Sequence, residues 1–175
     1  GKWWIDRMRE NANRSSLLIT ISPHDRDLAL ELLSVPADKV VTVPNGVDID
    51  VFRPRKMTDG ERISYWRRWL IDEPQGWKPN GEPGSIAYSD ADLGLFRNAD
   101  GSPAPVLLFV GRFVAFKRID VLLDAYELFL AESEHRAPLV IWGGFPGEWE
   151  GEHPYEYVKR RGIDGVFFAG WRGHD

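Results

Sequence analysis

Short apolar runs alternate with amphipathic stretches along most of the chain. Runs rich in β-branched and aromatic residues predict strands, and stretches with apolar residues on one helical face predict helices. The predicted strands are residues 16–22, 39–43, 106–110, 138–142 and 165–169. The predicted helices are residues 1–14, 22–34, 119–130 and 151–161. Strands that alternate with helices indicate parallel sheets, so we expect an α/β fold.

The clearest helix start follows the first predicted strand. Ser22 suits the N-cap, Pro23 the first helical position and Asp25 the acidic first turn. We expect Leu28 and Leu32, with the neighbouring leucine at 33, to form the buried side of this helix. A helix between strands 16–22 and 39–43 predicts one β-α-β unit with a parallel strand pair.

Residues 53–105 differ in character from the segments on either side. They are rich in Gly, Pro, Asp and Trp, and so long a stretch between two strands requires an explanation. We interpret them as an irregular insertion with a helix at 61–70 and a shorter one at 90–97, capped by Ser89. We expect that the insertion covers a cleft or selects an acceptor, and that deleting residues 58–100 leaves the fold intact.

The stretch 106–120 combines a predicted buried parallel strand with a basic turn. Arg112, Lys117 and Arg118 lie between this strand and the next helix. Cations are unfavourable at a helix N-terminus, and Asp120 offsets only part of that cost. A bound anion would offset more, since parallel α/β folds bind phosphates at the carboxyl ends of their strands. We interpret Arg112 and Lys117 as a phosphate clamp; the alternative is a solvated charged turn.

Composition narrows the function classes. The 175 residues carry a formal net charge of -5, which argues against broad nucleic-acid binding but permits a local basic pocket. The absence of cysteine excludes disulfides and thiolate metal sites. No apolar run approaches the roughly 20 residues that span a bilayer, and no signal peptide is visible. The eight tryptophans include five outside the strands that we expect to pack segments together, namely Trp3, Trp4, Trp66, Trp69 and Trp77.

An acidic cluster at residues 148–156 raises the question of a metal site. It contains Glu148, Glu150, Glu152, His153 and Glu156, but their spacing matches no tight ligand pattern. We interpret the cluster as a solvated loop and helix start, and we expect neither a metal nor another cofactor.

Several motifs occur together in a specific order. The chain carries Pro-Asn-Gly-Val-Asp at 44–48, Phe-Val-Gly-Arg at 109–112, a Gly-Gly turn at 143–144 and Phe-Ala-Gly at 168–170. This series resembles the retaining glycosyltransferases of family 4, which have the GT-B fold of two Rossmann-like domains facing a cleft. The resemblance spans most of residues 16–175 except the insertion. It implies that residues 1–52 end an N-terminal domain and its connector, and that residues 106–175 begin the C-terminal nucleotide-sugar-binding domain.

The family resemblance also implies a set of donor-binding residues. It assigns the diphosphate to Arg112 and Lys117, which offset charge on a leaving nucleoside diphosphate, and it places Gly111 among the donor-binding residues. The Gly143–Gly144 turn is expected to let backbone approach the nucleotide. The remaining expected donor residues, where the base is read, are Trp171 and Arg172. His174 and Asp175 lie beside them, with no role assigned.

The resemblance further implies what the protein binds and where it works. The donor is a UDP, GDP or ADP sugar, and the acceptor is a carbohydrate, a lipid or a small molecule. A hexosyltransferase of carbohydrate metabolism in the cytoplasm is expected, with peripheral membrane contact through an N-terminal domain. Because the family's paired glutamates are expected after Asp175, we interpret the chain as a fragment that is inactive alone.

The sequence offers three alternatives to a glycosyltransferase. A non-catalytic nucleotide-binding module and a glycosyl phosphorylase on the same fold both remain open. A nicotinamide-dependent oxidoreductase is disfavoured, because no Gly-x-Gly-x-x-Gly follows any predicted strand.

Overall fold

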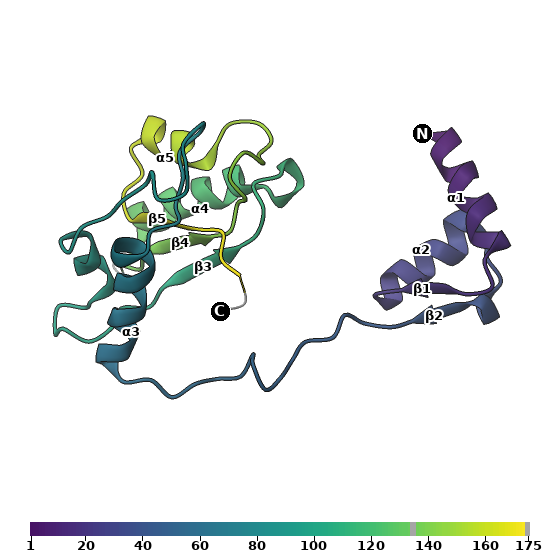
Figure 1. Ribbon diagram of the computed structural model, residues 1–175. Coiled ribbons are helices and arrows are strands. Elements are labelled where there is room, and N and C mark those ends of the chain that lie inside the picture. The colour runs from purple at the N-terminus through teal and green to yellow at the C-terminus, as the bar shows by residue number, and fades with distance from the viewer. Residues whose placement is uncertain (134–135, 174–175) are drawn as a thin grey trace. The chain divides into compact units, whose positions relative to one another are not determined.

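The computed structural model describes residues 1–133 and 136–173. The chain divides into two compact units, Gly1–Arg55 and Lys56–Asp175, each with its own parallel sheet (Figure 1). No helix among the described residues is both long and apolar enough to cross a bilayer.

The first unit is the predicted β-α-β segment preceded by a helix. Its elements are α1 (Lys2–Arg14), β1 (Leu18–Thr20), α2 (Pro23–Leu33) and β2 (Val40–Thr42). β1 and β2 pair in parallel, as expected. The Ser22 hydroxyl accepts a hydrogen bond from the backbone N–H of Asp25 at 3.1 Å, which confirms the predicted N-cap.

The buried side of α2 differs from the prediction. Leu28 and Leu32 are exposed, whereas Ala29 is buried. Ala29 and Leu33 are four residues apart and therefore share one helical face. The small core of this unit is made by Ala12, Val35 and Val40, with partly buried Leu18, Leu30 and Leu33 packed against it.

The connector after β2 is ordered locally by Asp48. Its carboxylate accepts hydrogen bonds from the backbone N–H groups of Asp50 at 2.9 Å and Val51 at 3.2 Å. The carbonyl of Asp48 also accepts from Phe52 N–H at 2.8 Å. This Asx turn supports a structural role for Asp48.

The second unit contains a three-stranded parallel sheet in the order β3-β4-β5. Its elements are α3 (Asp59–Arg67), a π-helical turn (Arg68–Asp72), β3 (Leu107–Val110), α4 (Ile119–Glu132), β4 (Leu139–Trp142), α5 (Pro154–Arg161) and β5 (Val166–Gly170). Sequential neighbouring strands joined by helices match one half of a doubly wound fold.

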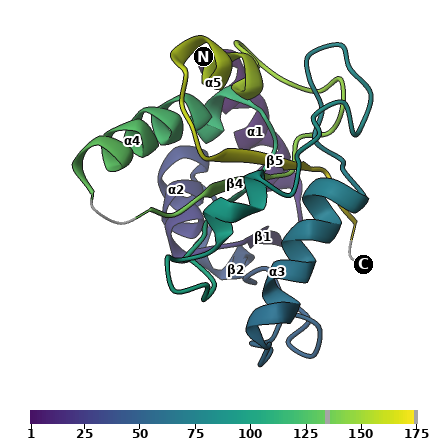
Figure 2. The ribbon, with the colours of Figure 1, turned by 90° about the vertical axis from the view of Figure 1, so that its left-hand side faces the viewer.

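The two faces of this sheet are covered by different segments. Figures 1 and 2 show α4 and α5 on one side of the sheet and α3 on the other. Leu139, Ile141 and Phe168 pack in the cluster that includes α4 and α5. Val140 and Phe167, of opposite parity along their strands, pack in the cluster that includes α3. The result is three layers, with β4 buried on both faces.

The prediction that residues 106–110 form a buried strand is wrong in its burial. β3 pairs in parallel with β4 as expected, but Leu107, Leu108 and Val110 are 42%, 55% and 64% exposed. The cause is position: β3 is an edge strand of the described sheet, and Phe109 is its side chain packed on the core.

The expectation that residues 58–100 are dispensable is contradicted. Leu70, Trp77 and Phe96 are at most 2% exposed and belong to the two hydrophobic clusters of the second unit. The Tyr88 hydroxyl also accepts a hydrogen bond from Phe168 N–H at 2.7 Å. The segment therefore supplies one layer of the unit and covers the outer edge of β5, so its removal would expose the core.

The tryptophans follow the prediction only in this second unit. The Trp69 and Trp142 rings meet edge to face with centroids 4.6 Å apart, and Trp66 packs on Phe96. Trp3 and Trp4 of α1 are each 64% exposed and contact each other. The expected packing role is therefore confirmed in the second unit and wrong for the described part of the first.

Candidate functional site

Three glycine turns meet at the carboxyl edge of the second sheet. Gly143 N–H donates to the Gly170 carbonyl at 2.8 Å, and Gly144 N–H donates to the Gly111 carbonyl at 3.1 Å. Gly111 N–H in turn donates to the carbonyl of Trp142 at 3.0 Å. The turn after β4 is thus hydrogen-bonded to the ends of both neighbouring strands, as expected where parallel strands end together.

The glycines at 143 and 144 are required by contacts within the protein. A Cβ on Gly143, whose φ is +120°, would lie 2.3 Å from the Gly111 carbonyl oxygen. A Cβ on Gly144, whose φ is +73°, would lie 2.6 Å from the Phe113 ring. Both glycines therefore pack directly on the protein's own atoms, and the expected approach of a nucleotide to this turn stays a prediction. The lack of side chains at Gly143 and Gly144 therefore allows the turn after β4 to pack closely on the turn after β3.

The basic turn after β3 has its cations in different environments. Arg118, with φ 48°, precedes α4 and pairs with Asp120 at 3.1 Å. Their hydrogen bonds raise the pKa of Arg118 and lower that of Asp120. Arg112 pairs with Glu148 at 3.0 Å, and both side chains are about half exposed or more. Lys117 lies over the Phe116 ring and has no carboxylate partner among the residues described.

A second carboxylate of the loop after β4 also contacts this turn. Glu150 accepts a hydrogen bond from Ala115 N–H at 2.7 Å, and its own N–H donates to the Phe113 carbonyl at 2.9 Å. Glu148 and Glu150 therefore occupy two of the anion-binding groups of the turn, Arg112 and the amide of Ala115. Of the two predicted clamp residues, Arg112 is paired with Glu148 and Lys117 lies over Phe116, so their joint role in binding a diphosphate stays a prediction.

The two residues predicted to read the base, Trp171 and Arg172, lie in different environments. Trp171 is 52% exposed and meets Phe145 edge to face with centroids 5.8 Å apart. The Arg172 guanidinium instead donates to the backbone carbonyls of Trp69 at 2.8 Å and Glu73 at 2.5 Å. Arg172 thus ties the exit of β5 to the π-helical turn, and its expected donor contact stays a prediction. His174 and Asp175 lie outside the described residues.

The acidic residues of the loop after β4 each have a separate partner. Glu152 forms a 2.7 Å ion pair with Arg160, while Glu148 and Glu150 contact the basic turn. Within residues 1–133 and 136–173, no group of three or more His, Cys, Asp or Glu is arranged to hold a metal ion.

A buried aromatic cluster under this loop was not predicted as part of the site. Trp77 donates its indole N–H to the Gly144 carbonyl at 2.9 Å. Its ring packs against Phe113, Trp149 and His153. His153 is 1% exposed, and burial lowers its pKa to about 4. The only sequence signal was the high tryptophan content, because the spacing of these residues follows no helix or strand period.

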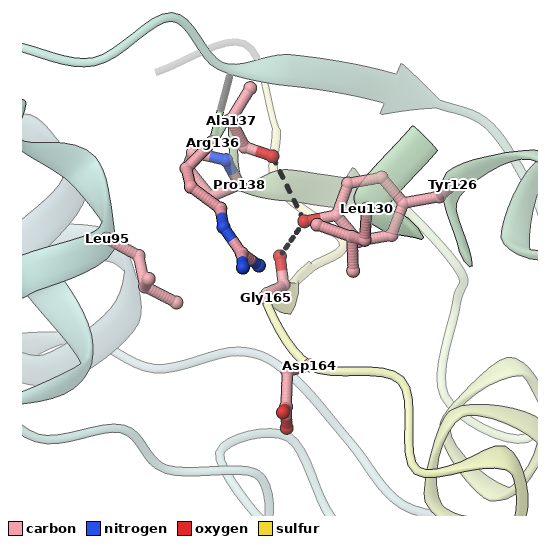
Figure 3. Close-up of a pocket in the computed structure, with 8 residues that line it drawn as sticks. All are labelled: Leu95, Tyr126, Leu130, Arg136, Ala137, Pro138, Asp164 and Gly165. Carbon is pink, nitrogen blue, oxygen red and sulfur yellow. Dashed lines mark hydrogen bonds between the residues drawn. The ribbon is translucent and has the colours of Figure 1, made fainter. Parts of the chain in front are cut away.

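A small cavity lies at the other end of the strands. Its volume is about 50 Å³, and its lining includes Ala137 and Pro138 before β4 and Gly165 before β5. Figure 3 shows the Tyr126 hydroxyl hydrogen-bonded to the carbonyls of Ala137 and Gly165, with Arg136 and Asp164 nearby. This cavity is too small for a nucleotide sugar and lies away from the glycine turns.

Comparison with known proteins supports the fold at low sequence identity. The chain matches no family model and no curated protein. It is similar to Anabaena Alr3699/HepE in crystal structures with UDP-glucose (TM-score 0.54, 21% identity, 97% of this chain and 37% of that one) and with UDP and glucose (0.56, 20%, 99% and 38%). The apo lipopolysaccharide outer core galactosyltransferase WaaB aligns at a TM-score of 0.47 and 20% identity, over 91% of this chain and 31% of that one, too weakly to support an inference.

The chain spans less than two fifths of the length of the HepE chains. Its architecture is α/β with parallel sheets, as expected from the sequence, and its fold is similar to part of the HepE chains.

Proposed function

We propose that this chain is part of a retaining glycosyltransferase that transfers a sugar from a nucleoside-diphosphate donor. The observation that carries the proposal is the meeting of a basic turn, at Arg112 and Lys117, with the Gly143–Gly144 turn at the carboxyl edge of parallel strands. Structures of similar fold that contain UDP-glucose, or UDP and glucose, support it.

In the proposed reaction, Arg112 and Lys117 bind the donor's diphosphate. The bond between the sugar's anomeric carbon and the β-phosphate oxygen breaks, so negative charge grows on the departing nucleoside diphosphate. A planar guanidinium and a mobile ammonium both stabilise that charge more as it develops, which lowers the barrier. The new bond to the acceptor oxygen forms with the same anomeric configuration, and the acceptor hydroxyl gives its proton to the departing diphosphate oxygen.

The Arg112–Glu148 pair is compatible with diphosphate binding. Both side chains are largely exposed, and exposed ion pairs contribute only about 0–1 kcal/mol. A diphosphate carries more charge than one carboxylate and can contact the Arg112 guanidinium in a bidentate way. We therefore propose that the donor displaces Glu148 from the guanidinium.

Calorimetric titration of the full-length protein with UDP, GDP and ADP tests this proposal. Arg112→Ala and Lys117→Ala should each weaken nucleotide binding by about 1.5–3 kcal/mol, or roughly 10- to 150-fold. Arg118→Asn is the matched control, because it removes a neighbouring charge already paired with Asp120 and Asn tolerates a positive φ. Unchanged affinity in both alanine variants, or an equal loss in the control, would reject the clamp.

The finer expectations stay predictions. They are the identity of the nucleotide and the sugar, the acceptor class, a role in carbohydrate metabolism, the cytoplasmic location and peripheral membrane contact. Phosphorylase activity is distinguished by assaying release of a sugar phosphate from inorganic phosphate and a glycoside.

A further inference from the structure

Trp77 belongs to residues 56–105, the part of the second unit that precedes β3, which we call the 56–105 segment. It links this segment to the Gly143–Gly144 turn of the candidate site. Its indole N–H donates to the carbonyl of Gly144 at 2.9 Å, across 67 positions of sequence. The side chain is 2% exposed, so this hydrogen bond is shielded from water. A buried carbonyl that lost its donor would be left unsatisfied, which is costly.

The same indole also contacts the basic turn after β3. Trp77 stacks on Phe113 with centroids 5.8 Å apart and planes 20° apart. Phe113 directly follows Arg112, and its ring fills the space beside Gly144 where a Cβ would be. One side chain therefore contacts both the basic turn, to which the diphosphate is assigned, and the glycine turn, which is expected to approach the nucleotide.

The surroundings of the indole are apolar and tightly enclosed. His153 meets Trp77 edge to face with centroids 4.5 Å apart, and Trp149 lies 5.6 Å away. The Nδ1 of His153 accepts a hydrogen bond from Tyr155 N–H at 3.1 Å, so the proton of the neutral ring is on Nε2. That buried Nε2 has no hydrogen-bond partner among the residues described. A dry cluster of this kind holds Trp77 in one position.

We infer that Trp77 is a positioning residue for nucleotide binding, because it fixes the Gly143–Gly144 turn against the Arg112 turn before the ligand arrives. The inference rests on the proposed function of this edge. Glycine backbone loses the most conformational freedom on ordering, and a turn that is already ordered avoids that loss at the moment of binding. The 56–105 segment, which is far from the turns in sequence, thereby contributes to the site.

A second variant in the same segment distinguishes a positioning role of Trp77 from a purely structural one. Tyr88→Phe removes another hydrogen bond between this segment and the sheet, the one from Phe168 N–H to the Tyr88 hydroxyl. That contact lies within β5, outside the glycine turns. Both variants should lower thermal stability, but only the Trp77 variant should change nucleotide affinity.

The experiment measures UDP affinity and thermal unfolding for wild type, Trp77→Phe and Tyr88→Phe. We expect a loss of about 5- to 10-fold in affinity for Trp77→Phe and less than about 2-fold for Tyr88→Phe, from the loss of one hydrogen bond at the site. If Trp77→Phe does not fold, incorporation of benzothienylalanine at position 77 keeps the ring shape and removes only the N–H donor. The same loss of affinity is expected for that protein.

The outcomes separate the two proposals. If the wild type binds UDP and the Trp77 and Tyr88 variants bind it with equal affinity, the positioning role is overturned and the proposed function stands. No binding of UDP, GDP or ADP by the full-length wild-type protein would overturn the proposed function and this inference with it. A selective loss in the Trp77 variant, with wild-type binding, supports both.

Discussion

Acid should destabilise the second unit through His153. The imidazole is 1% exposed, and burial lowers its pKa to about 4 in the folded state. In the unfolded chain the pKa is close to the ordinary value of about 6.5. Above pH 6.5 the ring is neutral in both states, so its contribution to stability is fully present. As the pH falls toward 4, the unfolded chain gains a proton that the folded protein excludes, and stability is lost.

The size of this loss follows from the two pKa values. A difference of about 2.5 units at 1.36 kcal/mol per unit amounts to about 3 kcal/mol between pH 7 and pH 4. That is a large share of the roughly 5–15 kcal/mol by which domains are stable. Well below pH 4 this group contributes no further change, because both states then bind the proton.

Urea unfolding followed by tryptophan fluorescence at several pH values measures the effect. His153→Asn is the matched variant, because asparagine can still accept the Tyr155 N–H at the start of α5 but does not titrate. The free energy of unfolding of the wild type should fall by about 3 kcal/mol relative to that of the variant between pH 7 and pH 4. A difference that stays constant across this range would refute the account of His153 as a buried neutral base.

The remaining predictions concern the 56–105 segment and the ion pair of the basic turn. Phe96→Ala should lower the free energy of unfolding by about 3–5 kcal/mol in urea titrations, because Phe96 is 1% exposed; the 43% exposed Leu95, changed to alanine, should cost less than about 0.5 kcal/mol, and equal effects would contradict the assigned layer. Glu148→Gln should raise UDP affinity about 2- to 5-fold in calorimetry, because Arg112 no longer has a competing anion. Glu152→Gln should leave UDP affinity unchanged, because Glu152 pairs with Arg160 instead. Weaker binding by the Glu148 variant would contradict the proposed exchange.

The sequence predicted the elements of the fold because their signals are local. Apolar runs gave the parallel strands, and Ser22, Pro23 and Asp25 gave a helix start that the structure confirms. Burial was predicted less well, because it depends on neighbours. β3 has the composition of an interior strand but lies at an edge, and Leu28 and Leu32 face away from the core that Ala29 joins.

The candidate site was predicted in part for the same reason. The basic and glycine turns are short motifs, so their positions could be read from the chain. Contacts across long sequence separations could not: Arg112 with Glu148, Arg172 with the carbonyl of Trp69, and Trp77 with the carbonyl of Gly144. Each joins a side chain to a partner at least 36 positions away, with no periodic pattern to indicate it.

A crystal structure with UDP tests the central claim most directly. The account predicts diphosphate oxygens within hydrogen-bond distance of the Arg112 guanidinium and the Lys117 ammonium, beside the Gly143–Gly144 turn, with Glu148 displaced from Arg112. A diphosphate bound to other residues while the Arg112–Glu148 pair stays closed would contradict it.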